Sequence, residues 1–443
     1  MKIQLSDHFT YSKLFRFTLP SIAMMVFTSI YGVVDGYFVS NFAGKTAFAA
    51  INLIMPFVMV LGGMGFMIGT GGTALVSKVL GQRNKATANR YFSMMIEVTL
   101  LLGILLGVLG VVFMEPVARF LKATDEMMAD CVLYGRIVTG FTVTFMLQNV
   151  FQSFLIAAEK PKLGLIATIA AGVTNMVLDA LFVGVFRWGV AGAAIATGLS
   201  QCVGGVFPLI YFLRPNSSLL RFKPAKLEWK PILRACANGS SELMSNVSSS
   251  LVSILYNFQL LRYYGENGVS AYGVLMYVQF IFIAIFIGYS IGCAPVVGFH
   301  YGAENHGELK NMLGKSVLLM GIGGIVLTAL AQGLAEPLAH IFVGYDADLY
   351  TLTVHAFRLF SFTFLLAGFN IFASSFFTAL NNGGVSAAIS FLRTLVFQCT
   401  CVLILPEVMR LDGIWWSNFF AEIGSFLVSL LFLLGMRKKY RYF

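Results

Sequence analysis

The stretch TAFAAINLIMPFVMVLGGMGFMIGTGGTALVS, residues 46–77, decides the class of fold. It contains no Asp, Glu, Lys or Arg. A helix of about 20 such residues is long enough to cross the roughly 30 Å hydrocarbon core of a bilayer. The stretch is therefore predicted to be a membrane-spanning helix. Its glycines indicate either close packing against other helices or a surface on which helices bend or slide.

The composition of the whole chain supports the same class. The chain has 443 residues, of which 58% are hydrophobic and 11% are charged. Soluble domains carry about 25% charged residues, so a soluble enzyme and a nucleic-acid-binding protein are both excluded. Enzyme motifs are absent: Leu313-Gly314-Lys315-Ser316 ends like a phosphate-binding loop, but Leu309 stands where that motif requires glycine. We expect no catalytic activity, no cofactor and no nucleic-acid partner.

Five histidines lack the spacing of metal ligands, and we expect them to be solvated or interfacial: His8, His300, His306, His340 and His355.

Apolar runs like residues 46–77 recur along the chain. Twelve of them are long enough to span a membrane, and an even number places both termini on the same side. The predicted spans are 14–40, 46–77, 92–114, 131–157, 163–183, 189–213, 232–262, 268–298, 313–334, 351–379, 384–405 and 413–435.

The basic residues predict which side that is. The chain has 30 Lys and Arg residues and a net charge of +10, and most of these cations lie in the loops on the side of the termini. Loops rich in Lys and Arg remain in the cytoplasm. We therefore expect a multi-pass protein of the inner (cytoplasmic) cell membrane with both termini in the cytoplasm.

An internal repeat divides the spans into two sets of six. At an offset of about 221 residues, Glu115-Pro116 matches Glu336-Pro337, and Gly81 matches Gly302. An even number of spans per repeat gives both halves the same orientation, related by a pseudo-two-fold axis along the membrane normal. The predicted fold is an all-α polytopic membrane protein with twelve transmembrane helices in two six-helix lobes.

The basic, proline-containing segment between the halves sets the predicted boundaries. They are an N-lobe at 1–213, a cytoplasmic linker at 214–231 and a C-lobe at 232–443.

Four polar residues of the first half are predicted to meet in the outer third of the membrane. Asp35 lies near the outer end of the first span, Asn175 and Asp179 share one helix face in the fifth, and Thr197 reaches a similar depth in the sixth. Ionisable residues at membrane depth are functional candidates. Oxygen ligands suit Na⁺, and two carboxylates in a low dielectric favour uptake of a proton. The alternative is that Asp35 only caps an interfacial helix end.

The second half offers a weaker candidate site. Glu242 and Arg393 lie at similar depths, which leads to the hypothesis that they form an ion pair, with Glu422 as the competing partner. Asn257 occupies the place of Asp35 in the repeat. These four residues form the candidate C-lobe polar site.

The sequence resembles the MATE (multidrug and toxic compound extrusion) transporters over essentially the whole chain, and leans towards their DinF-like branch. The resemblance rests on Val34-Asp35-Gly36, Asn175-xxx-Asp179, Gly81-Gln82 and the repeated Glu-Pro segments. It implies an antiporter that exports amphipathic, often cationic organic compounds in exchange for H⁺ or Na⁺. The cation site of that branch falls on Asp35, Asn175, Asp179 and Thr197.

We expect alternating access between the lobes, in which a proton or Na⁺ at Asp35 and Asp179 favours outward release of the substrate. The 42 Phe and 20 Met residues would give an adaptable binding surface. The expected partners are small amphipathic molecules and membrane lipids, and the expected state is a monomer. The nearest alternative is a lipid-linked oligosaccharide flippase, which would need a basic cluster in its cavity, whereas Arg393 is the one basic residue at mid-membrane depth. A channel and an intramembrane protease are more distant alternatives.

Overall fold

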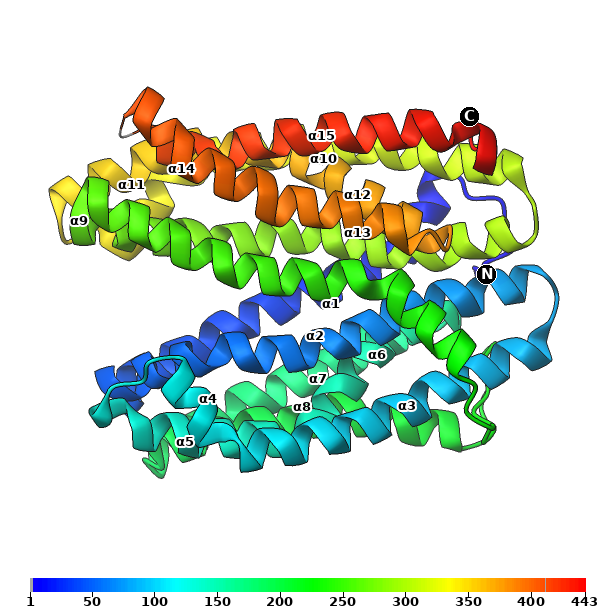
Figure 1. Cartoon of the computed structure of the whole chain (residues 1–443), viewed down its shortest axis with the longest axis horizontal. Coiled ribbons are helices and arrows are strands. Elements are labelled where there is room, and N and C mark those ends of the chain that lie inside the picture. Colours follow the sequence, from blue (N-terminus) through cyan, green and yellow to red (C-terminus); the bar gives the residue numbers. More distant parts are fainter. Residues whose placement is uncertain (1–2, 411) are drawn as a thin grey trace.

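The computed structural model describes residues 3–410 and 412–443, and every regular element in that part of the chain is a helix. Figure 1 shows the helices in two bundles, with α1–α8 in one and α9–α15 in the other. Both chain ends lie at the same end of the molecule, which we call the termini side. The two bundles diverge towards the opposite side (Figure 1).

The first bundle contains one span that is broken and two that end in π-helical turns. The break separates α5 from α6 and bends the pair by 55°. The π-helical turns, Val39–Ala43 and Ala180–Val185, directly follow α1 and α7. The helices are α1 Tyr11–Phe38, α2 Lys45–Gly81, α3 Lys85–Val112, α4 Met114–Phe120, α5 Asp125–Gly140, α6 Thr142–Ala157, α7 Pro161–Asp179 and α8 Gly189–Leu213.

The second bundle begins with α9, which contains two predicted spans. Gly265 breaks α9, because its φ of 63° and ψ of −152° are outside the helical region. A 3₁₀ turn at Ser361–Thr363 joins α11 to α12, and a π-helical segment at Leu392–Phe397 joins α13 to α14. The helices are α9 Trp229–Gly302, α10 His306–Val343, α11 Ala347–Phe360, α12 Phe364–Ala379, α13 Gly383–Phe391, α14 Gln398–Met409 and α15 Asp412–Tyr440.

Each of the twelve predicted spans falls on a helix or a helix pair, and the all-α polytopic membrane fold is confirmed. Within the described residues, ten helices are long and apolar enough to cross a bilayer, and the bent pair α5–α6 is an eleventh. The predicted span 232–262 is the exception, because serine and asparagine residues make this half of α9 less apolar.

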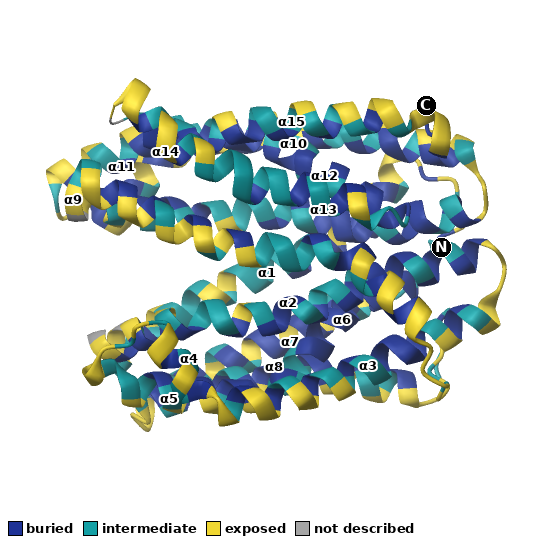
Figure 2. Ribbon diagram, in the orientation of Figure 1, coloured by how far each residue is buried: buried dark blue, intermediate teal, exposed yellow. Residues whose placement is uncertain are grey.

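The outward face of α3 shows how the fold treats its apolar side chains. Leu101, Ile104, Leu105 and Val108 lie on one face of the helix and are each more than half exposed. Figure 2 shows such exposed residues along the outside of both bundles and buried residues where helices meet. A row of exposed aliphatic side chains is costly in water but not against lipid chains.

The lobes meet where the backbones of α2 and α9 touch. A Cβ on Gly71 would lie 1.9 Å from the carbonyl oxygen of Ala235, and a Cβ on Gly239 would lie 1.9 Å from that of Met67. Any side chain at either glycine is therefore excluded. For Gly71, the close-packing interpretation of the glycine-rich span is confirmed.

A second crossing joins α2 to the far end of α9. A Cβ on Gly81 would lie 1.9 Å from the oxygen of Phe299, and a Cβ on Gly302 would lie 1.9 Å from that of Lys78. Because Gly81 and Gly302 are equivalent in the repeat and contact each other's helix, this crossing lies at the pseudo-two-fold axis. We call the two crossings, at Gly71, Gly81, Gly239 and Gly302, the seam.

Gly302→Val tests the seam. The added side chain would force α2 and α9 apart, and we expect the free energy of unfolding to fall by about 1–3 kcal/mol, as for overpacked cores. The measurement is the thermal unfolding midpoint of the purified protein in detergent. Gly314→Ala in α10 is the matched control, because a Cβ at Gly314 has no neighbour within 4 Å. If Gly302→Val and Gly314→Ala had equal unfolding midpoints, close backbone contact of α2 and α9 at Gly302 would be contradicted.

Candidate functional site

The two N-lobe acids lie where regular α-helix gives way to π-helix. Asp35 is in the last turn of α1, just before the π-helical turn Val39–Ala43. Asp179 is the last residue of α7, just before the turn Ala180–Val185. Single π-helical turns occur frequently at functional sites, because they redirect side chains within a helix.

A small residue brings the helices of the two acids together. A Cβ on Gly172 of α7 would lie 2.5 Å from the Phe27 ring and 2.8 Å from the Tyr31 ring, both of α1. With α7 packed so closely on α1, the carboxyl groups of Asp35 and Asp179 become direct electrostatic neighbours. Counting residues along the spans gave only the depth of each acid in the membrane. In the structure Asp35 and Asp179 also lie side by side.

The four predicted N-lobe residues present buried oxygen atoms that lack hydrogen-bond partners among the described residues. Asp179 is fully buried, and Asn175, one turn before it, is 2% exposed. Unsatisfied buried oxygens cost free energy unless a proton or a cation is bound. Because every one is an oxygen, the set fits Na⁺ or H⁺. The atoms are Asp35 Oδ1, Asn175 Oδ1, Asp179 Oδ1 and Oδ2, and Thr197 Oγ1.

Two tyrosines complete this site and were missed by the sequence analysis. Tyr134 of α5 is 1% exposed and lies beside Thr197 and both carboxyl groups. Tyr31 lies one turn before Asp35 on the same face of α1 and neighbours its carboxyl group. That four-residue spacing was a signal for Tyr31. Nothing in the sequence indicated Tyr134, because an uncharged residue in an apolar span resembles ordinary packing.

In the C-lobe, the partner of Arg393 is Glu422, not Glu242. The Arg393 Nη2 lies 2.7 Å from Glu422 Oε1, and its Nε lies 2.9 Å from the same oxygen. Asn370 of α12 donates to Glu422 Oε2 over 2.6 Å and to the Glu422 backbone oxygen over 3.0 Å. The Glu422 side chain is 2% exposed and that of Arg393 is 16% exposed. The carboxylate is thus satisfied by two side chains.

The other two C-lobe candidates lie outside this network. In the described part of the chain, Glu242 makes no ion pair, and Asn257 is exposed on α9. Depth counting along each span could not determine which neighbour Glu242 faces. Asn370 was missed as a site residue, although the repeat relates it to Asn149, which donates to the Gly62 oxygen over 3.0 Å.

Breaking the C-lobe pair should be costly. Arg393→Ala leaves Glu422 as a buried, uncompensated charge, and we expect about 3–5 kcal/mol of destabilisation. The double change Arg393→Ala with Glu422→Ala should cost less than the sum of the single changes. Both effects are measured by thermal unfolding of the purified proteins.

The matched control for that measurement is Arg119→Ala. Arg119 pairs with Glu115 over 2.8 Å, but both side chains are exposed, so little change is expected. If Arg393→Ala behaved like Arg119→Ala, the pair would not stabilise the C-lobe.

The fold and the site define a two-lobed, multi-pass membrane protein with a buried carboxylate site in one lobe. The chain belongs to the MatE family, whose family model matches residues 20–181 and 243–402. Proteins of this family are transporters, not enzymes, and need no cofactor.

Similar proteins cover nearly the whole chain. The multidrug export protein MepA of Staphylococcus haemolyticus is 23% identical over 451 residues, which cover 99% of this chain and 97% of MepA. A crystal structure of a MATE protein in complex with MaL6 has a TM-score of 0.90, with 22% identity and 96% of each chain covered. A multidrug resistance MATE transporter in an outward-facing conformation has a TM-score of 0.89, also with 22% identity and 96% of each chain covered.

Proposed function

We propose that this protein is a secondary antiporter that exports amphipathic, often cationic organic compounds in exchange for H⁺ or Na⁺. The observation that carries the proposal is the group of buried, unpartnered oxygens around Asp35 and Asp179. Membership of the MatE family and the similarity to the multidrug export protein MepA support export of small molecules. Assignment to the DinF-like branch stays a prediction.

The proposed mechanism uses the charge of the N-lobe site. With Asp35 and Asp179 unoccupied by a cation, their carboxylates attract a cationic substrate into the space between the lobes. Uptake of H⁺ or Na⁺ by the same oxygens, which include Asn175 and Thr197 for Na⁺, cancels that attraction and favours release of the substrate. The coupling lies in the competition of two cations for one set of negative charges.

The arrangement of the lobes supports alternating access. The seam lies in the termini half of the molecule, where a further contact joins Asn381 Nδ2 to the Ala74 oxygen over 3.1 Å. The bundles diverge on the other side (Figure 1). With the termini in the cytoplasm, as the basic loops predict, this is an outward-facing conformation. The similarity to an outward-facing MATE transporter supports that interpretation.

The proposal also includes the boundaries of the lobes, the oligomeric state and the location of the protein. The lobes comprise residues 1–213 and 232–443, with 214–231 as a cytoplasmic linker, and the protein works as a monomer among lipids of the inner cell membrane. The oligosaccharide flippase is disfavoured, because Arg393 is neutralised by Glu422 and offers no free positive charge to a pyrophosphate.

Asp35→Asn and Asp179→Asn test the site. Each removes one of the two negative charges, and we expect dye efflux from expressing cells to fall to the level of cells without the protein, with normal expression. Glu126→Gln is the matched control, because Glu126 is an exposed acid in the first turn of α5. Undiminished efflux by Asp35→Asn would overturn the proposed mechanism.

The coupling ion is tested in liposomes that contain the purified protein. A pH gradient and a Na⁺ gradient are imposed separately while transport of a fluorescent cation is recorded. We expect one of the two gradients to drive transport, and Asp179→Asn to abolish that response. Equal transport with no gradient of either ion would show a uniporter or a channel instead.

A further inference from the structure

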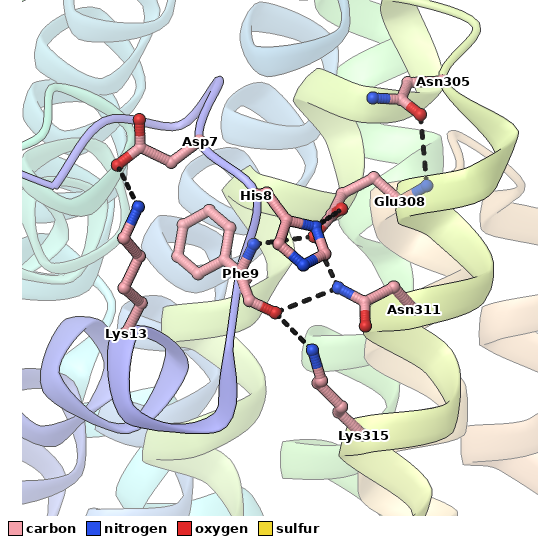
Figure 3. Close-up of polar contacts among 8 residues, drawn as sticks. All are labelled: Asp7, His8, Phe9, Lys13, Asn305, Glu308, Asn311 and Lys315. Carbon is pink, nitrogen blue, oxygen red and sulfur yellow. Dashed lines mark hydrogen bonds and ion pairs between the residues drawn. The ribbon is translucent and has the colours of Figure 1, made fainter.

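The chain that precedes α1 lies across both lobes on the termini side. Leu5 and Phe9 are fully buried. The backbone N–H of Leu5 donates to Glu159 Oε1 over 3.0 Å, and Glu159 lies between α6 and α7 of the first lobe. Four residues later, the backbone of Phe9 is bound by α10 of the second lobe (Figure 3).

Glu308 is the centre of the contact with α10. Its side chain is 6% exposed and accepts from the Phe9 N–H over 2.9 Å. The ring of His8 lies 2.7 Å from the same carboxyl group. Asn311 donates to Glu308 and, over 3.0 Å, to the Phe9 oxygen, which also accepts from Lys315 over 2.6 Å (Figure 3). The backbone N–H and the backbone oxygen of Phe9 are therefore both hydrogen-bonded by side chains near the start of α10.

A buried histidine lies beneath this segment. His300, near the end of α9, is 2% exposed, and neither ring nitrogen has a hydrogen-bond partner among the described residues. It faces the backbone of Leu5 and Asp7 and is an electrostatic neighbour of Glu308. His300 is therefore not solvated, because the segment before α1 covers it.

The segment before α9 makes the matching contact in the opposite direction. It runs along α3 of the first lobe, and its alternate N–H groups donate to side chains one helical turn apart. The bonds are Arg221 to Asn89 over 3.0 Å, Lys223 to Ser93 over 2.8 Å and Ala225 to Glu97 over 3.2 Å.

The binding positions on α3 and α10 nearly correspond in the internal repeat, although the bound residues do not, since the equivalent of Phe9 is Lys230 and α3 binds residues 221–225. Asn311 and Lys315 of α10 stand one residue beyond the 221-residue offset from Asn89 and Ser93 of α3. Each lobe therefore has its leading segment bound to the third span of the other lobe. The two differ in chemistry, since α10 offers one buried carboxylate with several donors, whereas α3 offers three separate acceptors.

We propose that residues 5–10 form a latch that closes the seam on the termini side, with Glu308 as its receptor, and that the latch must release in each transport cycle. The step rests on the proposed alternating access. Residues 5 and 9 are bound to different lobes and can be at most about 14 Å apart. If the lobes separate at this end, the segment has to leave either Glu159 or Glu308.

Cysteine accessibility tests the latch without any substrate. In a background without the six native cysteines, Ser77→Cys reports on the seam, because Ser77 is fully buried and its Cβ lies 3.1 Å from a Cβ placed on Gly298 of α9. We expect Glu308→Gln and Phe9→Ala each to raise the rate of labelling by a maleimide about tenfold, since each removes a buried or charge-assisted contact. Glu304→Gln, at an exposed acid just before α10, should leave the rate unchanged.

Unchanged labelling in both folded variants would overturn the latch. Thermal unfolding of each protein shows whether it is folded. If both variants unfold, the double variant His8→Cys with Asn311→Cys, which keeps Glu308 and Phe9, decides the question, because Asn311 contacts the Phe9 oxygen next to His8. A reducible thiol cross-linker should stop efflux, and reduction should restore it. Efflux that continues in the cross-linked protein would also overturn the latch. If the uncross-linked protein exports nothing, the proposed function fails, and the labelling rates still decide the latch.

Discussion

The backbone contact between α2 and α9 is the constraint on which the two-lobed arrangement depends. At Gly71 and Gly239 the helices approach until a carbonyl oxygen of one occupies the space of a side chain on the other. Such a contact gains dispersion energy and weak Cα–H···O interactions. Buried apolar side chains of both helices, among them Val76, Val79 and Val296, belong to one core cluster, so separation of the lobes also breaks side-chain packing. Hydrogen bonds between the lobes are made at the edge of the seam, where Phe9 meets Glu308 and Asn381 meets Ala74, and also between α3 and the segment before α9.

The two lobes treat buried charge in opposite ways. In the C-lobe, Glu422 is matched by Arg393 and hydrogen-bonded by Asn370, so the pair is neutral and fixed between α12, the π-helical segment before α14, and α15. In the N-lobe, Asp35 and Asp179 face each other, and neither forms an ion pair with a described side chain. Only the second arrangement can change its net charge by binding a small cation. In the proposed antiport mechanism, the N-lobe site therefore binds the coupling ion, whereas the Glu422–Arg393 pair stays neutral.

The strongest signals in the sequence were charges, present or missing. Uncharged runs located the helices, and the rare acids within them led to Asp35 and Asp179 by counting residues along each span. Counting gives height in the membrane but not direction around the helix, which is why Glu242 was favoured over Glu422 for Arg393. Tyr134 gave no signal at all, since its place beside the carboxyl groups results from the packing of α5 on α8. The buried His300 depends on a chain segment about 290 residues away, and no local pattern contains that information.

The exchanged leading segments also bear on how such a protein could arise. Each lobe covers the third span of the other, so a lobe on its own would leave the acceptors of α3 or the carboxylate of α10 without their backbone donors. Two copies of a single lobe would satisfy both sets by trading these segments across a two-fold axis, in the manner of a swapped dimer. Fusion of the two copies into one chain preserves that trade and places Gly81 opposite Gly302. This chain thus has the internal geometry of a homodimer, with Asp35 and Asp179 unpaired in one half and Glu422 paired with Arg393 in the other.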